Sequence, residues 1–365
     1  MTLDGRFWPR HSLDMNELAQ SQQTLVDELL VMAPSALAER LRRIADDLQL
    51  AYSANTLRGW RSDWGVWLAF CRQHGVAPLP TNVVVLRAFL LERAGQGRKR
   101  ATLEHNLATL SMVHRLAQLP FPLDSMEGRL MWRGIKREHL TLRQRQAQGL
   151  TLDDIEKVLA TLDAKAPRDA RDAALLSVAY ESMCRRSELV AMQLEHLSEE
   201  ADGSGRLLLP SSKTDQEGAG ALQYLSPTAM GRIRHWLALA SITDGSVFRS
   251  TPKSNRPNRF ENSLSGRDVA RIFKRLAALA GLDSTLISGH STRVGATQDL
   301  LADNFSGAEI MRQGRWKTER MIVRYGERLA AGRGAMAKML HARERQQEVL
   351  RADLPTPGAD SPKSG

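Results

Sequence analysis

Apolar side chains recur every three or four residues over much of the first third of this chain, which is the period of an amphipathic helix. The densest stripe contains Trp60, Trp64 and Trp67, and this spacing places the three indoles on one helix face. We expect them to point into the core of a helical bundle. The pattern predicts such a bundle, of four or five helices, over residues 25–135, preceded by a loose arm at residues 1–24 that has no clear period.

The apolar stripe gives way to a basic run near the middle of the chain. Residues 136–150 carry one lysine, three arginines and three glutamines and are punctuated by Gly149, so we interpret them as a basic interdomain linker. A solvated, charged helix end is the other interpretation, because charge runs usually face water. Thr151 followed by two aspartates is typical of a helix N-terminus, and it predicts a second domain at residues 151–350. The tail at residues 351–365 has the composition of a disordered segment.

The second domain is expected to be helical, apart from one stretch. Leu207–Pro210 and Ala221–Tyr224 are short apolar runs on either side of a polar, glycine-rich segment, which predicts two antiparallel strands. The expected fold class is therefore mainly α with a small antiparallel β-sheet, in which an N-terminal helical bundle precedes a mixed α/β domain. Helices are predicted at residues 151–163, 168–184, 227–240, 266–280, 292–303, 307–314, 317–324 and 334–350.

Charge and cysteine content narrow the class of protein. The chain carries 51 Lys and Arg against 41 Asp and Glu, a net charge of +10, which favours a polyanionic partner because each neutralised phosphate releases condensed counterions. Two cysteines are too few for a disulfide framework, and no His/Cys cluster has zinc-ligand spacing. No signal peptide is evident, and no run reaches the roughly 18 apolar residues of a membrane span. We expect a cytoplasmic protein without a metal. Charge alone does not decide whether it binds nucleic acid, because basic proteins that do not bind nucleic acid are common.

Several short stretches of the second domain carry side chains suited to holding a charged phosphate. Each has an ordinary structural explanation when taken singly: an ion pair, a turn lysine, a capping or core histidine, or a buried tyrosine. Their order and combination are what favour a functional site. In chain order they are Arg185-Arg186-Ser187-Glu188, Lys213-Thr214, His290-Ser291-Thr292-Arg293, Trp316 and Tyr325.

Two expectations about local structure accompany these motifs. Arg185 and Glu188 are three residues apart, so their side chains share a helix face if the preceding helix continues through them. Tyr325 is followed directly by Gly326, which places the tyrosine at a helix end rather than inside a helix.

The order Arg-x-x-Glu, lysine in a β-hairpin, His-x-x-Arg, Trp and then Tyr resembles that of the tyrosine recombinases, also called phage integrases. The resemblance runs over roughly residues 50–345 and is most specific in the catalytic motifs. It implies a two-domain enzyme whose N-terminal bundle closes over one face of the DNA while the C-terminal domain performs the chemistry. The implied activity is site-specific recombination of double-stranded DNA through a 3′-phosphotyrosine and a Holliday junction, for integration, excision or resolution.

The resemblance implies a role for each motif residue. Tyr325 would be the nucleophile, Arg185 and Arg293 would clamp the non-bridging phosphate oxygens, and Lys213 would protonate the departing 5′-oxygen. A bidentate guanidinium fits a phosphate better than an ammonium does, and the phosphotyrosine conserves bond energy, so no cofactor is required. The supporting residues would be His290 as a proton holder, Trp316 as a packing and indole N–H group, and Glu188 as an orienting group acting through His290.

DNA contacts and assembly are also implied by the resemblance. A helix capped by Ser265 would enter the major groove, with Arg267 placed to read a guanine. The apolar stripe of the C-terminal helix, which includes Met336 and Met339, would dock on a neighbouring protomer and build a homotetramer on two inverted-repeat sites. The remaining expected contacts are Lys274 and Arg275 on the groove helix, and Arg58, Arg98, Lys99 and Arg100 in the first domain.

Two other functions remain open on sequence grounds. A type IB topoisomerase shares the Arg, Lys, His/Arg and Tyr chemistry, but it lacks the N-terminal clamp and acts without a specific site. A DNA-binding protein with a degenerate site is disfavoured, because no catalytic position is missing.

Overall fold

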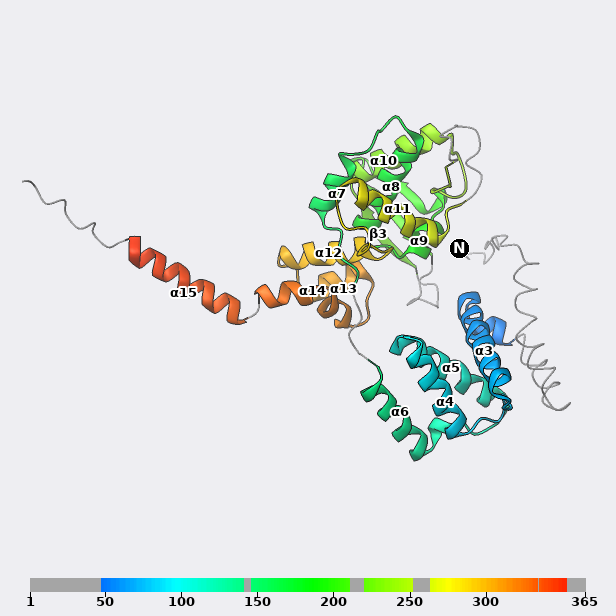
Figure 1. Ribbon diagram of the computed structural model, residues 1–365. Coiled ribbons are helices and arrows are strands. Elements are labelled where there is room, and N and C mark those ends of the chain that lie inside the picture. The colour runs from blue at the N-terminus through cyan, green and yellow to red at the C-terminus, as the bar shows by residue number, and fades with distance from the viewer. Residues whose placement is uncertain (1–46, 141–145, 211–219, 252–262, 334, 353–365) are drawn as a thin grey trace, which may run out of the picture. The chain divides into compact units, whose positions relative to one another are not determined.

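The computed structural model is mainly helical with one small antiparallel sheet, as predicted. The chain divides between Gln144 and Arg145 into two compact units, and Figure 1 labels their helices and strands. The N-terminal arm at residues 1–24 and Lys213 lie outside the described residues. The structure describes residues 47–140, 146–210, 220–251, 263–333 and 335–352.

The first unit is a helical bundle built around aromatic side chains. Its helices include α3 (Ala54–His74), α4 (Val83–Gly95), α5 (Arg100–Leu116) and α6 (Met126–Glu138), with a 3₁₀ turn, η1, at Pro122–Asp124. Trp64 and Trp67 are fully buried and Trp60 is 9% exposed, so the predicted core face is confirmed. Trp67 meets Phe89 edge-on, with ring centroids 5.1 Å apart, and this contact joins α3 to α4.

Both ends of α3 are set by local chemistry. The hydroxyl of Ser53 accepts a hydrogen bond from the backbone N–H of Thr56 at 3.3 Å, which satisfies one of the free donors of the first turn. At the other end Gly75 adopts a left-handed φ of 63° and ends the helix, a conformation that costs glycine little.

The basic run in the middle of the chain has two structural parts. Helix α6 continues to Glu138 with Met131 and Ile135 buried on one side, so Arg133 and Arg137 are the exposed face of a helix end. This part matches the alternative interpretation of the run. Farther on, the backbone N–H of Gln148 donates to the carbonyl of Leu286 at 3.0 Å, so this part of the run belongs to the second unit.

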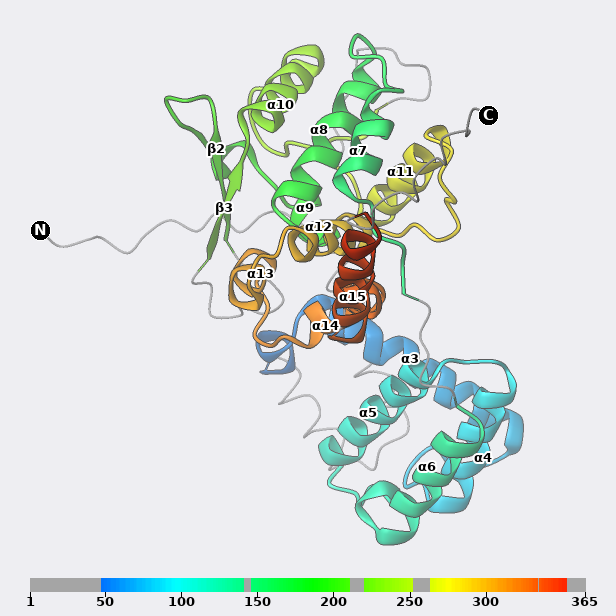
Figure 2. The ribbon, with the colours of Figure 1, turned by 90° about the vertical axis from the view of Figure 1, so that its left-hand side faces the viewer.

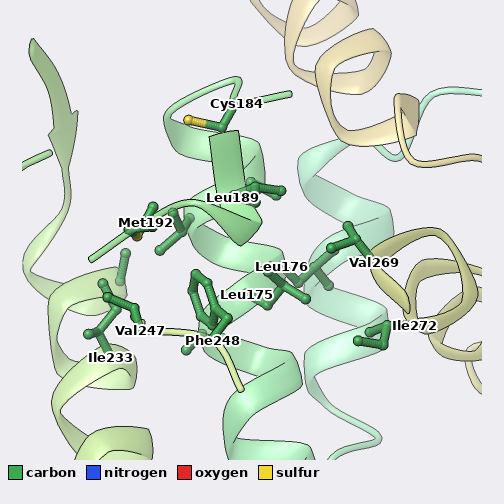
Figure 3. Packing of buried hydrophobic residues seen from close by; sticks show 14 of the residues in the cluster. Leu175, Leu176, Cys184, Leu189, Met192, Ile233, Val247, Phe248, Val269 and Ile272 are labelled. Atoms are coloured by element: carbon green, nitrogen blue, oxygen red, sulfur yellow. The ribbon is translucent and has the colours of Figure 1, made fainter. Parts of the chain in front are cut away.

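Helix α8 forms the centre of the second unit (Figure 2), packing against α7, α10 and α12. Leu175 and Leu176 of α8 are fully buried and belong to one core with Ile233 of α10 and Ile272 of α11 (Figure 3). The helices and turns are α7 (Leu152–Leu159), α8 (Pro167–Glu181), α9 (Arg186–Val190), η2 (Leu194–His196), α10 (Pro227–Ala240), α11 (Gly266–Leu279), α12 (Ser291–Ala302), α13 (Gly307–Gly314), α14 (Arg320–Arg333) and α15 (Ala335–Ala352).

The sheet has the order β1-β2-β3 and is antiparallel throughout. The predicted pair corresponds to β2 (Gly205–Leu209) and β3 (Ala221–Leu225), with Leu207 opposite Gln223. A third strand, β1 (Leu197–Glu199), pairs with the other edge of β2. A strand of three residues is too short to show an alternating pattern, so it was not predicted.

Tyr325 lies inside a helix, so the prediction that it sits at a helix end is wrong. Helix α14 runs from Arg320 to Arg333 and passes through Gly326. A Cβ at Gly326 would lie 2.6 Å from Cδ1 of Leu301 on α12. The glycine therefore allows two helices to approach closely, and it does not mark the end of one.

Gly295 provides a stability test of a similar close approach, between α12 and the segment that precedes α7. A Cβ at Gly295 would lie 1.7 Å from the backbone carbonyl oxygen of Leu150, and a backbone atom cannot rotate away. We expect Gly295→Ala to lower the free energy of unfolding by about 3 kcal/mol, seen as a reduced melting temperature by circular dichroism.

The matched control is Gly231→Ala in the middle of α10, where the only neighbour within 4 Å is the end of the Arg234 side chain at 3.9 Å. This change should raise stability by roughly 0.5–1 kcal/mol, because glycine is a poor helix former. If Gly295→Ala had the same melting temperature as the wild-type protein, the close approach would not be needed for stability.

Candidate functional site

The chain breaks sharply after α8, at the point where the candidate site begins. Helix α8 ends at Glu181, and Met183 takes a left-handed φ of 48°. Arg185 is consequently the N-cap of the short helix α9. The preceding helix does not continue through Arg185 and Glu188, which was the condition for the shared helix face, because a new helix starts at Arg186.

Glu188 bonds both the backbone and the side chain of Arg185. Its Oε2 accepts from the Arg185 N–H at 2.7 Å and its Oε1 accepts from Arg185 Nη1 at 2.7 Å. Burial alone would raise the pKa of Glu188, but the charge of Arg315 and the bonds from Arg185 outweigh it and hold the pKa below its usual value. The carboxylate is therefore ionised, and it orients Arg185.

Arg293 projects from the first turn of α12 into a buried position. Its guanidinium donates to the backbone carbonyls of Met183 and, at 2.8 Å, of Gly314. Burial, together with the charges of Arg185 and Arg315, lowers the pKa of Arg293 to about 10, which still leaves it protonated at neutral pH. The structure thus holds a positive charge where only backbone dipoles and one carboxylate offset it.

Trp316 joins Arg293 to Tyr325. Its ring packs on Gly314, where a Cβ would lie 2.7 Å from the indole. The guanidinium carbon of Arg293 lies 5.2 Å from the centroid of the ring, within cation–π range. The Trp316 and Tyr325 rings are 5.7 Å apart at an interplanar angle of 66°. The indole therefore fixes the tyrosine ring beside a buried cation.

His290 is the N-cap of α12 and remains exposed. Arg186 crosses the preceding residue, since a Cβ at Gly289 would lie 1.9 Å from Arg186 Cδ. Partial desolvation, followed by the charges of Arg186, Arg293 and Arg185, lowers the pKa of His290. Both kinds of effect act in the same direction, so the imidazole is neutral at neutral pH.

The structure brings together most of the predicted site residues, and it adds two. The second partner of Glu188 is Arg315, whose Nη2 donates to Glu188 Oε2 at 2.6 Å. Arg186, the neighbour of His290, lies in the first predicted stretch, but the sequence assigned it no role of its own. Sequence offered no signal for Arg315, because its contact to Glu188 spans 127 residues. The predicted residues that lie in this cluster are Arg185, Glu188, His290, Arg293, Trp316 and Tyr325.

The candidate DNA contacts of the second unit differ in their exposure and in whether their charge is already paired. Ser265 caps α11 with Asp268, as predicted, and Arg267 next to this cap is exposed. Lys274 is also exposed. Arg275 instead pairs with Asp172, a fully buried carboxylate, so at least part of its charge is already balanced within the protein.

In the first unit, three of the four candidate contacts face solvent. Arg58, Arg98 and Lys99 are exposed. Arg100 is only partly exposed and pairs with Glu104 at 2.8 Å. The N-terminal end of α5 therefore presents a basic surface.

The cluster is suited to an anionic ester. Arg185 and Arg315 share the carboxylate of Glu188, and Arg293 lies within range of its charge, so the positive charges of the arginines outnumber the one negative charge. Fixed cations in a partly dry site stabilise the negative charge that develops during phosphoryl transfer. Tyr325 supplies a hydroxyl, and His290 supplies a neutral base.

Metal-binding clusters and membrane-spanning helices are both absent from the described ranges. There, no group of three or more His, Cys, Asp or Glu side chains is placed to hold a metal ion. Nor is any helix of these ranges long and apolar enough to cross a membrane.

Known proteins resemble this chain in both sequence and fold. The model of the phage integrase family matches residues 148–331. The recombinase Cre of Escherichia phage P1 is 26% identical over 334 residues, covering 87% of this chain and 97% of that protein. An integrase/recombinase XerD homolog of Selenomonas ruminantium is 30% identical over 289 residues, covering 77% and 83%. The XerH recombinase in a post-cleavage complex with a palindromic difH substrate has a TM-score of 0.55 at 13% identity, covering 89% and 98%.

Proposed function

The chain belongs to the phage integrase family, and on that basis we propose how its residues carry out recombination. It is a site-specific tyrosine recombinase, an enzyme that breaks and rejoins double-stranded DNA. The observation that carries the residue roles is that Arg185, His290 and Tyr325 each interact electrostatically with Arg293. This reaction needs cations to bind the phosphate, a neutral base and a hydroxyl.

In the proposed cleavage step, Oη of Tyr325 attacks the scissile phosphorus. An O–P bond to the tyrosine forms while the bond to the 5′-oxygen breaks, leaving a 3′-phosphotyrosine and a free 5′-hydroxyl. His290 takes the tyrosine proton, and Lys213 supplies a proton to the leaving 5′-oxygen. The same steps in reverse, with the 5′-hydroxyl of a second duplex, exchange the strands through a Holliday junction.

The proposed clamp on the phosphate consists of Arg185 and Arg293. Glu188 binds Nη1 of the Arg185 guanidinium. Within the described residues, the Nη2 and Nε of Arg185 have no hydrogen-bond partner. These N–H groups are free to meet a non-bridging oxygen. Trp316 keeps the tyrosine ring in place, as the ring contact indicates.

We further propose that both units contact DNA and that four copies assemble on two sites. Arg267 would read a base and Lys274 a phosphate, while the basic surface at the start of α5 would meet the backbone. Met336, Met339 and Leu340 of α15 are 65%, 39% and 49% exposed. This apolar face would pack on a neighbouring protomer, and the paired half-sites would form inverted repeats of nucleoid DNA in the cytoplasm.

The test uses nicked, end-labelled duplexes prepared from DNA around the gene for this protein. A nick beside the scissile phosphate lets a short fragment diffuse away, so the covalent intermediate accumulates and appears as a labelled protein band on a denaturing gel. Exchange between two duplexes of different length then reports rejoining. A protein that relaxed supercoiled plasmid lacking the site just as fast would favour the topoisomerase alternative. Binding without a band would favour the non-catalytic one.

His290 gives the reaction a predictable pH dependence. Only a neutral imidazole accepts the tyrosine proton, and the pKa of His290 is lowered from the usual 6.5. The histidine therefore stays neutral at pH values where a free histidine begins to charge. We expect the single-turnover cleavage rate to fall on the acid side, with the midpoint of this fall below pH 6.5, the ordinary pKa of a histidine.

Two variants test the assignment of this acid limb. His290→Asn should cleave slowly, and its rate should show no fall at acid pH that depends on an imidazole. Replacing the exposed His139 of the first unit with Asn should leave the pH dependence of cleavage unchanged. A wild-type limb centred above pH 6.5 would contradict the lowered pKa of His290.

A further inference from the structure

Arg315 forms a bridge between two loops of the active site. Its Nη2 donates to Glu188 Oε2 at 2.6 Å, and its Nη1 donates to the carbonyl of Ser182 at 3.1 Å. Ser182 and Met183 form the turn that delivers Arg185, so one guanidinium holds both that turn and the carboxylate that orients Arg185. The side chain of Arg315 is only 9% exposed.

The backbone of Arg315 has an unusual conformation for an arginine. It ends α13 with φ 52° and ψ 50°, in the left-handed region, which costs a residue with a Cβ roughly 1 kcal/mol or more relative to glycine. The next residue is Trp316, which contacts both Arg293 and Tyr325. The turn at Arg315 thus joins the Glu188 side of the site to the tyrosine side.

The hydrogen bonds of Arg315 tie its guanidinium to the turn before Arg185 and to Glu188. Its two terminal nitrogens bond Ser182, Met183 and Glu188, and its Nε is buried without a hydrogen-bond partner. Arg185 differs, since only its Nη1 is bonded to Glu188. Because the side chain of Arg315 is only 9% exposed and bonds Glu188 directly, we assign it an effect on Arg185 through Glu188.

The charges show what that action is. Glu188 alone would neutralise Arg185, the residue placed to meet the phosphate. With Arg315 on its other oxygen, the carboxylate is shared between two arginines, so Arg185, Arg315 and Glu188 together keep one positive charge. A phosphodiester under attack by a phenolate carries two negative charges in its pentavalent transition state. Removing Arg315 would lower the positive charge available to meet them by one and leave Glu188 paired with Arg185 alone.

We propose that Arg315 is a positioning residue that balances the charge of Glu188 and so keeps Arg185 available as a cation for the scissile phosphate. The proposal rests on the recombinase function above. It assigns Arg315 a role in the rate of cleavage and no direct contact with the substrate.

The test compares Arg315→Gln with the double variant Arg315→Gln/Glu188→Gln in the full-length protein. The substrate is the nicked duplex that the wild-type protein cleaves. Arg315→Gln should cleave roughly 10- to 100-fold more slowly, while its affinity for the uncleaved duplex changes less than about threefold, because phosphate contacts elsewhere dominate binding. The double variant removes the unbalanced carboxylate as well, so it should cleave about tenfold faster than Arg315→Gln.

A merely structural role would not produce this rescue, because the second substitution removes further hydrogen bonds. A double variant slower than Arg315→Gln, or an Arg315→Gln rate within about threefold of wild type, would overturn the proposal. If Arg315→Gln does not fold, the double variant is compared with Glu188→Gln. Similar rates support the proposal, and a double variant more than about tenfold slower overturns it.

Failure of the underlying function gives a different result. If the wild-type protein formed no covalent complex with any nicked duplex, the recombinase mechanism itself would be wrong. Wild-type cleavage combined with an unimpaired Arg315→Gln would overturn only the role of Arg315.

Discussion

Tyr325→Phe is expected to bind DNA normally and to form no covalent complex. The substitution removes only the hydroxyl that becomes bonded to phosphorus. The ring, which packs 5.7 Å from Trp316 between centroids, is retained, so the fold and the site should persist. On the nicked duplex we expect the labelled protein band to disappear entirely, while the gel-shift affinity stays within about twofold of wild type.

Tyr224→Phe is the matched control for the loss of a phenolic hydroxyl. Tyr224 lies on β3 of the same unit and is 60% exposed, so its loss should affect neither binding nor cleavage. A covalent band persisting in Tyr325→Phe would show that another residue is the nucleophile. Loss of the band in Tyr224→Phe would point to a general defect.

Arg293→Lys should have the second largest effect. The Arg293 guanidinium spans the carbonyls of Met183 and Gly314, and an ammonium cannot make this fork and also meet a phosphate oxygen. We expect single-turnover cleavage to slow by about 10²- to 10³-fold, comparable with the loss of one group that stabilises a developing oxyanion.

The positive charge is kept in this variant, so weaker general attraction to DNA cannot explain a loss. Arg234→Lys is the control, since Arg234 is 53% exposed and pairs with Glu199 at the surface, where such pairs contribute little. Melting curves show whether Arg293→Lys remains folded at the assay temperature. Cleavage close to the wild-type rate in a folded Arg293→Lys would argue against the clamp.

Periodicity alone predicted most of the helices. α10 and α13 have the predicted bounds, 227–240 and 307–314, because Ser226 and Ser306 cap them and charged or small residues follow. The errors lie where tertiary packing decides the backbone. Helix α8 ends at Glu181, three residues before the predicted end, and Met183 then takes a left-handed φ; Gly326 resembles a helix stop until its contact with Leu301 is known.

The site was predictable in its residue types but not in its connections. The motifs and their order identified a phosphoryl-transfer cluster, and the resemblance assigned roles. Which group balances Glu188 depends on the turn at Arg315, and nothing local in the sequence indicates a contact across 127 residues. The roles of Arg315 and Arg186 therefore emerge only from the structure.

The surplus of positive charge around Arg293 also affects the stability of the protein. Burial and the neighbouring arginines lower the pKa of Arg293 to about 10, which means that the folded chain disfavours this cation when no anion is present. A DNA phosphate removes that penalty, so it takes the place of a missing acidic side chain. In thermodynamic terms the DNA substrate stabilises the folded catalytic unit by binding to it. The free enzyme is less stable by the cost of the buried cation, and part of that free energy is recovered when the cation meets the charge of the transition state.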